Sequence, residues 1–255
     1  MIVEYFRPAS LQEALALLQR PDPLSVPLGG GTALNRPSET RLAAVDLQNL
    51  GLDQVEVRGN LVHLGATLTL QKLADTPGLP SALILATNHE ATYNLRQVAT
   101  VAGSLVASDG LSPFACAMLA LDADLKVLKS GGAEAAVSLA LGEFLPGRSF
   151  IGFSGLILEV SIPLNIRLAY EQVARTPQDK PLLCTSLAQW PSGRTRISLG
   201  GFGPSVVLAL DGPEPGGAQA AVRSALAHSG DDWASAEYRQ ETAAILVERM
   251  LSEAV

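Results

Sequence analysis

The sequence predicts a protein of the α+β class, built from two or three units that each combine a small sheet with its own helices. The chain has 255 residues, enough for one to three domains with a substantial core. Short apolar runs typical of strands alternate with helical patterns up to a boundary at Pro163-Leu164-Asn165. Beyond that boundary, three strand-like runs come first and two helical runs follow.

The composition favours a soluble, cytoplasmic protein. A formal charge of −7 argues against nucleic acid or an anionic membrane as partner. Cys116 and Cys184 lie in apolar runs and are expected to be buried. Two cysteines cannot hold an iron–sulfur cluster or a structural zinc ion, and the three histidines lack ligand spacing, so we expect no metal site. No apolar run approaches the roughly 18 residues of a membrane span, and no signal peptide is expected.

Local signals predict the elements before the boundary. Residues 2–6 are β-prone, and Ser10 with Glu13 forms a capping box at the start of a helix. Residues 54–65 alternate around Gly59-Asn60, which predicts a hairpin with a two-residue turn. The other predicted elements are strands at 26–28 and 42–47, helices at 70–74, 80–89 and 113–121, and strands at 124–128, 133–138 and 156–162.

The C-terminal part predicts a layer of strands with helices on one face. Its three consecutive strands are expected at 169–174, 182–189 and 195–199. A linker rich in glycine and proline follows at 211–217. Two helices, at 218–227 and at about 234–254, then complete the chain.

Two stretches of small residues are the candidate ligand-binding segments. Three glycines, 29–31, follow a short apolar strand and begin a loop, and a second run of small residues lies at 100–104. Glycine and alanine let the backbone approach a ligand, and free N–H groups can then bind an anion such as pyrophosphate. A flexible turn and tight core packing would produce the same patterns, and neither stretch is a Walker or Rossmann motif. If both serve one ligand, that ligand is long, and FAD has the length.

The order of motifs along the chain resembles the FAD-binding (medium) subunit of the molybdenum hydroxylases, the family of the carbon monoxide dehydrogenases, xanthine dehydrogenases and aldehyde oxidases. Gly30–Leu34 matches its Gly-Gly-Thr-x-Leu loop, and Leu64–Leu70 matches Ile-Gly-Ala-x-x-Thr-Leu. Leu95–Leu105 lies over Ile-Arg-Asn-x-x-Thr-Ile-Gly-Gly-Asn-Leu. Further matches lie at 6–14, 119–123, 170–175, 199–204 and 235–239, so the resemblance covers nearly the whole chain.

The resemblance implies a two-part FAD-binding fold of the vanillyl-alcohol oxidase (PCMH) type, followed by a small C-terminal α+β domain. That domain is expected to hold a three-stranded antiparallel sheet with helices on one face. The implied limits are residues 1–55 and 56–164 for the two FAD-binding subdomains, and 165–255 for a C-terminal domain of the carbon monoxide dehydrogenase flavoprotein type.

The resemblance also implies a function. The chain is expected to be a flavoprotein subunit of an oxidoreductase, partnered by a large molybdenum-cofactor subunit and a small iron–sulfur subunit. It would pass electrons from the iron–sulfur centres through FAD to an external acceptor, with no catalytic side chain of its own. The expected FAD contacts, made mainly through backbone N–H groups, are Gly29, Gly30, Gly31, Thr32, Ala33, Leu34, Ala91, Thr100, Val101, Ala102, Gly103 and Ser104, with Asp109 as a carboxylate for a hydroxyl contact.

The chain departs from the family pattern at six positions, two of which are Asn35, in place of a common leucine, and Gln97, in place of an asparagine. Ala102 replaces the first glycine of Gly-Gly-Asn, Ser104 its asparagine, Pro113 an aspartate and Gln172 a lysine. Alanine at 102 is expected to disfavour a positive φ and to keep the loop further from a phosphate. The substrate, the electron acceptor and the oligomeric state are not specified by the sequence. Two other functions remain open: a structural or assembly subunit that binds FAD weakly or not at all, and a free-standing flavin oxidase.

Overall fold

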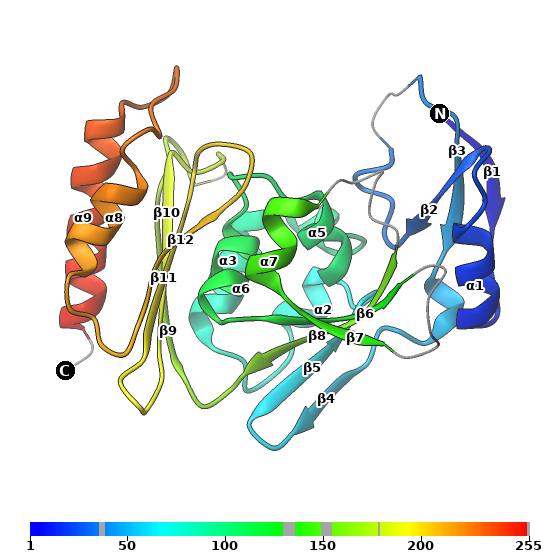
Figure 1. Ribbon diagram of the computed structural model, residues 1–255, viewed down its shortest axis with the longest axis horizontal. Helices are drawn as coiled ribbons and strands as arrows, with labels where there is room; N and C mark the ends of the chain where they lie inside the picture. The colour runs from blue at the N-terminus through cyan, green and yellow to red at the C-terminus, as the bar shows by residue number, and fades with distance from the viewer. Residues whose placement is uncertain (36–38, 130–135, 149–154, 178, 254–255) are drawn as a thin grey trace. The chain divides into compact units, whose positions relative to one another are not determined.

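The computed structural model describes the chain except residues 36–38, 130–135, 149–154, 178 and 254–255 (Figure 1). Its contacts divide the chain into two compact units. The first comprises Met1–Asp75, Tyr93–Ala107 and Asp124–Ser161, and the second comprises Thr76–Thr92, Ser108–Ala123 and Ile162–Val255. The chain thus passes between the units several times. The consecutive domains 1–55, 56–164 and 165–255 stay a prediction.

The first unit begins with a parallel sheet in the order β1-β3-β2. Its strands are β1 (Ile2–Phe6), β2 (Leu24–Leu28) and β3 (Leu42–Asp46), and the central strand β3 is buried throughout. Helix α1 (Leu11–Leu18) connects β1 to β2. The predicted cap is confirmed, because Ser10 Oγ accepts a hydrogen bond from Glu13 N at 3.2 Å and the Glu13 carboxylate accepts one from Ala9 N at 2.8 Å.

The second sheet of this unit has the order β4-β5-β8-β6-β7. The predicted hairpin is confirmed, since Arg58 pairs with Leu61 across the Gly59-Asn60 turn and Gly59 has a φ of +61°. The strands are β4 (Val55–Arg58), β5 (Leu61–Gly65), β6 (Asp124–Lys129), β7 (Val137–Ala140) and β8 (Gly155–Pro163). The helical segments are η1 (Gln48–Leu50), α2 (Leu70–Ala74), α4 (Tyr93–Arg96), α5 (Val101–Ala107) and α7 (Leu141–Gly147).

The second unit is built on an antiparallel sheet in the order β12-β11-β10-β9. Its strands are β9 (Arg167–Val173), β10 (Leu183–Gln189), β11 (Thr195–Gly200) and β12 (Val207–Gly212). Helices α8 (Ala218–Ala225) and α9 (Ala236–Ser252) cover one face, and α3 (Ser81–Glu90) and α6 (Pro113–Ala120) cover the other (Figure 1). Strand β10 is buried over most of its length because both faces of the sheet are covered.

Two details of the predicted C-terminal layer are wrong. The sheet has a fourth strand, β12, and its last residues, Asp211 and Gly212, belong to the segment that the sequence predicts as a linker. Helices lie on both faces rather than on one, because α3 and α6 come from earlier parts of the chain. A local pattern shows that a helix forms, but it does not show which sheet the helix will cover.

The buried groups agree with the expected character of the chain. Cys116 and Cys184 are both free and buried, as predicted. Cys116 lies on α6, with its Sγ 3.3 Å from Ser198 Oγ on β11. No helix in the described part of the chain combines the length and the hydrophobicity needed to cross a membrane.

Candidate flavin site

A cavity in the first unit brings the two predicted segments together. All six residues from Gly29 to Leu34 line it, and Thr100, Ala102 and Gly103 contribute from the second segment. It encloses about 90 Å³, so it can take only part of a dinucleotide, and the rest would lie outside it. The other lining residues, which the sequence pattern did not indicate, are Val26, Pro27, Leu47, Ala66, Thr67, Val106, Gly155, Leu156 and Ile157.

Glycine backbones allow the two segments to touch. A Cβ built on Gly30 would lie 1.6 Å from the carbonyl oxygen of Val98, and one on Gly29 would lie 2.6 Å from Thr100 Oγ1. Gly31 has a φ of +74°, in the left-handed region that favours glycine. Packing within the unit and backbone conformation therefore require these glycines, whether or not a ligand is bound.

The glycine loop carries a row of backbone donors without an internal acceptor. None of the described residues accepts a hydrogen bond from the N–H groups of Gly30, Gly31, Thr32 or Ala33. The next bond along the chain joins Asn35 N to Gly31 O at 3.0 Å and closes a single helical turn. The first N–H groups of such a turn have no partner within it. Consecutive unpaired amides beside a cavity suit an anionic group such as a phosphate.

The second segment differs from the expected loop. Helix α5 begins at Val101, so residues 101–104 form its first turn. The expectation of a second row of free amides is wrong, because all four N–H groups are already paired. In order along the chain, their acceptors are Leu68 O, Ala66 O, Thr100 Oγ1 and Thr100 O, at 2.8, 3.1, 3.2 and 2.8 Å. This segment offers small side chains to the cavity rather than donors.

Ala102 fits its position without strain. It lies within α5, and Asp122 is the non-glycine residue of the described chain that has a positive φ. Alanine is the most favourable residue in a helix interior. The expected conformational penalty at 102 is therefore wrong, and what remains of the change from glycine is one methyl group in the cavity wall.

Four predicted contacts lie away from the cavity lining. Val101 is fully buried, and Ser104 lies on α5 without lining the cavity. Ala91 and Asp109 belong to the second unit, where Asp109 Oδ1 accepts a hydrogen bond from Leu111 N at 2.9 Å. Their roles in binding FAD stay a prediction.

Two of the departures from the family pattern have local structural roles in the second unit. Pro113 is the first residue of α6, where its missing N–H costs nothing, and the Ser112 hydroxyl caps that helix by accepting from Ala115 N at 3.0 Å. Gln172 accepts a hydrogen bond from the Tyr170 hydroxyl at 2.6 Å.

Comparison with known proteins identifies related sequences. The family model for the FAD binding domain in molybdopterin dehydrogenase matches residues 1–165. The uncharacterised protein YgfM of Escherichia coli K12 is 35% identical over 127 residues, which span 49% of this chain and 49% of YgfM, about half the length of each. The carbon monoxide dehydrogenase medium chain of Afipia carboxidovorans is 26% identical over an alignment of 280 residues, covering 98% of this chain and 96% of that protein.

Solved structures share the fold. A chain of the reconstituted carbon monoxide dehydrogenase from Oligotropha carboxidovorans superposes with a TM-score of 0.80 at 23% identity, covering 96% of this chain and 95% of that one. A chain of quinoline 2-oxidoreductase from Pseudomonas putida 86 gives a TM-score of 0.78 at 22% identity, covering 98% of this chain and 95% of that one. At these identities the likeness shows the fold alone. Together with the family match over residues 1–165, it confirms the prediction of an FAD-binding part followed by a C-terminal antiparallel sheet domain.

The family match covers more than half of the chain, and the glycine loop and the small-residue segment that carried the resemblance line one cavity within it. The chain therefore belongs to the family of FAD binding domains in molybdopterin dehydrogenases, and its cofactor is FAD.

Proposed function

We propose that this chain is the FAD-binding, electron-transfer subunit of a cytoplasmic molybdenum hydroxylase. In this role it receives electrons from iron–sulfur centres on a partner subunit and passes them to an external acceptor. The observation that carries the proposal is the row of N–H groups at residues 30–33, which have no acceptor among the described residues and lie beside the cavity. Family membership and the near full-length similarity to a carbon monoxide dehydrogenase medium chain support it.

The residues of the cavity fit the phosphate-bearing part of FAD. The amides of Gly30 to Ala33 supply donors for phosphate oxygens, and the described residues of the lining include neither aspartate nor glutamate that would repel them. Apolar side chains, among them Val26, Leu156 and Ile157, form other parts of the wall. Bound FAD supplies the redox chemistry, while the chain binds and orients it.

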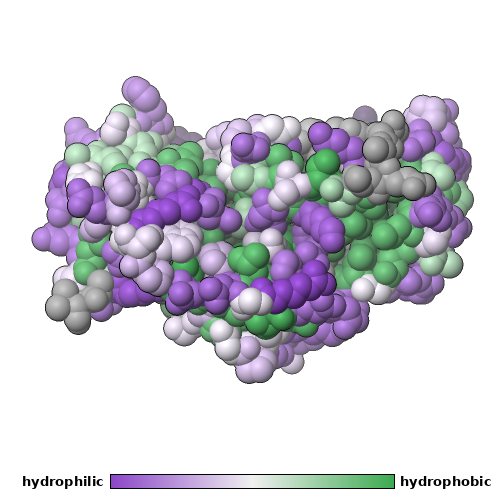
Figure 2. Space-filling model, turned by 60° about the horizontal axis from the view of Figure 1, so that its bottom comes forward, coloured by the Kyte–Doolittle hydropathy of each residue, from purple (hydrophilic) through white to green (hydrophobic). Residues whose placement is uncertain are grey.

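In this proposal the iron–sulfur centres lie on a partner subunit. The two cysteines of this chain are both buried, and its described residues contain no cluster of three or more potential metal ligands that could hold such a centre. The proposed partners are a small iron–sulfur subunit and a large molybdenum-cofactor subunit. Large hydrophobic side chains of the first unit, including Tyr93, Leu95 and Val98, reach the surface, and Figure 2 shows hydrophobic surface on that unit at the right of the view. Exposed apolar surface is typical of proteins that function in complexes.

One observation favours a second candidate function, that of a structural or assembly subunit that binds FAD weakly. The amides of residues 101–104 are already paired, so one of the two expected rows of donors is absent. Pro113 and Gln172, which replace an aspartate and a lysine of the family pattern, have local roles within the second unit.

Visible absorption distinguishes the two functions. The purified chain is incubated with FAD, freed of excess cofactor by gel filtration, and measured in the flavin region. We expect a yellow protein with close to one FAD per chain. A chain that emerges colourless would support the assembly function.

Two matched glycine variants test whether the loop binds the cofactor. Gly31 and Gly51 both have a positive φ, +74° and +65°, but only Gly31 lines the cavity. Replacing either with alanine costs comparable backbone strain. We expect Gly31→Ala to weaken FAD binding and Gly51→Ala to leave it unchanged. Equal affinity in the two variants would contradict the proposed site.

A further inference from the structure

A second cavity lies within the second unit, among residues that the proposed function does not use. It encloses about 440 Å³, within the usual range of about 300 to 1,000 Å³ for small-molecule sites. Its polar and aromatic lining consists of Arg175, Asp179, Lys180, Asp231, Trp233 and Arg239. None of these residues lines the cavity of the glycine loop.

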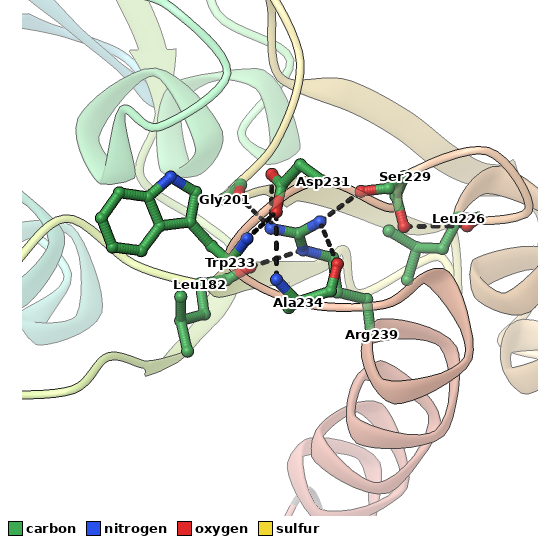
Figure 3. Close-up of polar contacts among 8 residues, drawn as sticks. All are labelled: Leu182, Gly201, Leu226, Ser229, Asp231, Trp233, Ala234 and Arg239. Carbon is green, nitrogen blue, oxygen red and sulfur yellow. Dashed lines mark hydrogen bonds and ion pairs between the residues drawn. The ribbon is translucent and has the colours of Figure 1, made fainter.

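Arg239 holds one wall of this cavity in place (Figure 3). Its side chain is fully buried, and all five of its N–H donors are used. One of them reaches Asp231 Oδ2 at 2.8 Å, while Asp231 Oδ1 accepts hydrogen bonds from Trp233 N at 2.9 Å and Ala234 N at 3.0 Å. The other four go to the carbonyl oxygens of Leu182, Ser229, Ala234 and Gly201. The charges of Arg239 and Asp231 are therefore paired with each other, and the backbone of Trp233 is fixed.

Trp233 presents an aromatic surface to ligands. Figure 3 shows its indole projecting away from the Arg239–Asp231 pair, and the residue is 63% exposed. The guanidinium carbon of Arg175 lies 4.4 Å from the indole centroid, in a cation–π contact. Among the described residues no carboxylate forms an ion pair with Arg175. A flat ring can stack on the uncovered part of the indole, with a cation beside it.

A second Arg–Trp pair in the same unit, Arg194 and Trp190, differs from Arg175 and Trp233 in the partners of its arginine. The guanidinium of Arg194 lies 4.8 Å from the Trp190 centroid, but it also forms ion pairs with Asp122 and Asp211 at 2.9 and 2.8 Å. Neither Arg194 nor Trp190 lines the cavity. Protein carboxylates thus neutralise the charge of Arg194, whereas no carboxylate of the described residues pairs with Arg175.

Lys180 adds a second cation, whose protein contacts are long. Its Nζ lies 3.7 Å from Glu90 Oε1 and donates a hydrogen bond to the Glu90 carbonyl oxygen at 3.4 Å, and its side chain is 50% exposed. The other carboxylate oxygen of Glu90 accepts hydrogen bonds from Ser112 Oγ at 2.7 Å and Phe114 N at 3.1 Å, so Glu90 has partners besides Lys180. Asp179, the remaining carboxylate of the lining, accepts a hydrogen bond from Thr176 N at 3.1 Å.

We propose that this cavity binds a flat aromatic anion, with its ring stacked on Trp233 and its negative group held by Arg175 and Lys180. Aromatic carboxylates and aromatic phosphates share this chemistry. The inference does not depend on FAD binding, because the lining residues of the two cavities do not overlap.

Equilibrium dialysis of the full-length chain tests the proposal, with 1-naphthyl phosphate and 1-naphthoate as probes and inorganic phosphate as an anion without a ring. Probe binding is measured with and without FAD, and FAD binding is measured on the same sample. A chain that does not bind FAD can then still be tested for binding of the probe. We expect saturable binding of one naphthyl probe per chain, with the tighter of the two identifying the preferred anionic group. Inorganic phosphate should bind far more weakly.

Variants assign the binding to the named side chains. We expect a loss of about tenfold in affinity for the preferred probe in each of three variants, Arg175→Ala, Lys180→Ala and Trp233→Leu. The matched controls Trp190→Leu and Lys126→Ala, an exposed lysine of β6, should leave it unchanged. All five substitutions replace side chains at the surface or outside the buried core, and circular dichroism verifies that each variant is folded. The proposal is overturned if neither naphthyl probe binds, if inorganic phosphate binds as tightly, or if folded Trp233→Leu binds like the parent.

Discussion

Single residues in this protein show how one backbone atom can determine which side chain is possible. Gly30 lies against the carbonyl oxygen of Val98, where a Cβ would approach to 1.6 Å. A backbone carbonyl cannot rotate away as the end of a side chain can, so the loop itself would have to move. The same glycine provides one of the free amides of the candidate flavin site. Packing against Val98 and binding of a ligand by the backbone amide therefore both favour glycine at this position.

Gly30→Ala should lower the free energy of unfolding by about 3 kcal/mol, at the upper end of the usual cost of overpacking. It should also weaken FAD binding, because the loop is displaced. Urea denaturation measures the first effect and flavin absorbance the second. Gly147→Ala is the control, since a Cβ there meets no atom of the described residues within 4 Å. Equal stability of the two variants would show that the loop relaxes without cost.

The Asp231 carboxyl group links the stability of the second unit to pH, because its pKa is lowered in the folded protein. Burial alone would raise the pKa of its carboxyl group, but the hydrogen bonds from Arg239 and from the backbone of Trp233 and Ala234 outweigh burial and lower that pKa below its ordinary value of 3.8. A carboxyl group with a lowered pKa in the folded state stabilises the protein above its unfolded pKa. That stability is lost as the pH falls through the folded pKa.

Asp231→Asn should therefore lower the melting temperature at neutral pH, and the deficit should shrink as the pH falls below 3.8, because the parent then loses the same charge. Thermal melts followed by circular dichroism from pH 7 downward measure this. A deficit that stays constant with pH would indicate that the ion pair with Arg239 does not contribute through its charge.

At the scale of elements, local signals predicted those parts of the fold whose cause is local. The Ser10 cap, the Gly59-Asn60 turn and Pro113 at the start of α6 each act within a few residues, and the structure contains all three elements. Strand β12 was not predicted, because it ends against a segment rich in glycine and proline. The helices on the second face of the sheet were not predicted either, because α3 and α6 precede that sheet in the sequence.

Local patterns also predicted only those features of the candidate site that have a local cause. Small residues identified both segments, because close approach of backbones requires such residues wherever it occurs. The pairing of the α5 amides was missed, since their acceptors include Ala66 and Leu68, which lie on a distant part of the chain. The apolar wall at 155–157 gave no local sign of a cavity, because a buried strand has the same pattern.

Helix α5 allows a direct test of this interpretation. Ala102→Gly restores the residue of the family motif, yet it places glycine in a helix. We expect it to reduce stability by less than the roughly 1 kcal/mol that glycine costs in a helix interior, because residue 102 lies in the first turn. It should leave FAD affinity nearly unchanged, because the N–H of residue 102 is already bonded to Ala66 O. Urea denaturation and flavin titration measure the two effects. A gain in stability would contradict the helical assignment, and a large gain in affinity would show that the methyl group obstructs the cofactor.

At the scale of the whole molecule, the two cavities belong to different units and share no lining residue. A ligand that binds only the folded protein raises the free energy of unfolding according to its concentration relative to its dissociation constant. At a hundredfold excess over that constant, FAD should stabilise the chain by about 2.7 kcal/mol. Thermal melts at increasing FAD concentration measure this effect.

The glycine variants then indicate where the stabilisation originates. FAD should raise the melting temperature of Gly51→Ala as it does that of the parent, while the shift for Gly31→Ala should be smaller at every FAD concentration, because only Gly31 lines the first cavity. Trp233→Leu should respond to FAD like the parent, because its side chain lines only the second cavity. If Trp233→Leu lost the FAD-dependent shift instead, the two cavities would be coupled in binding, and the independence inferred from their separate linings would be wrong.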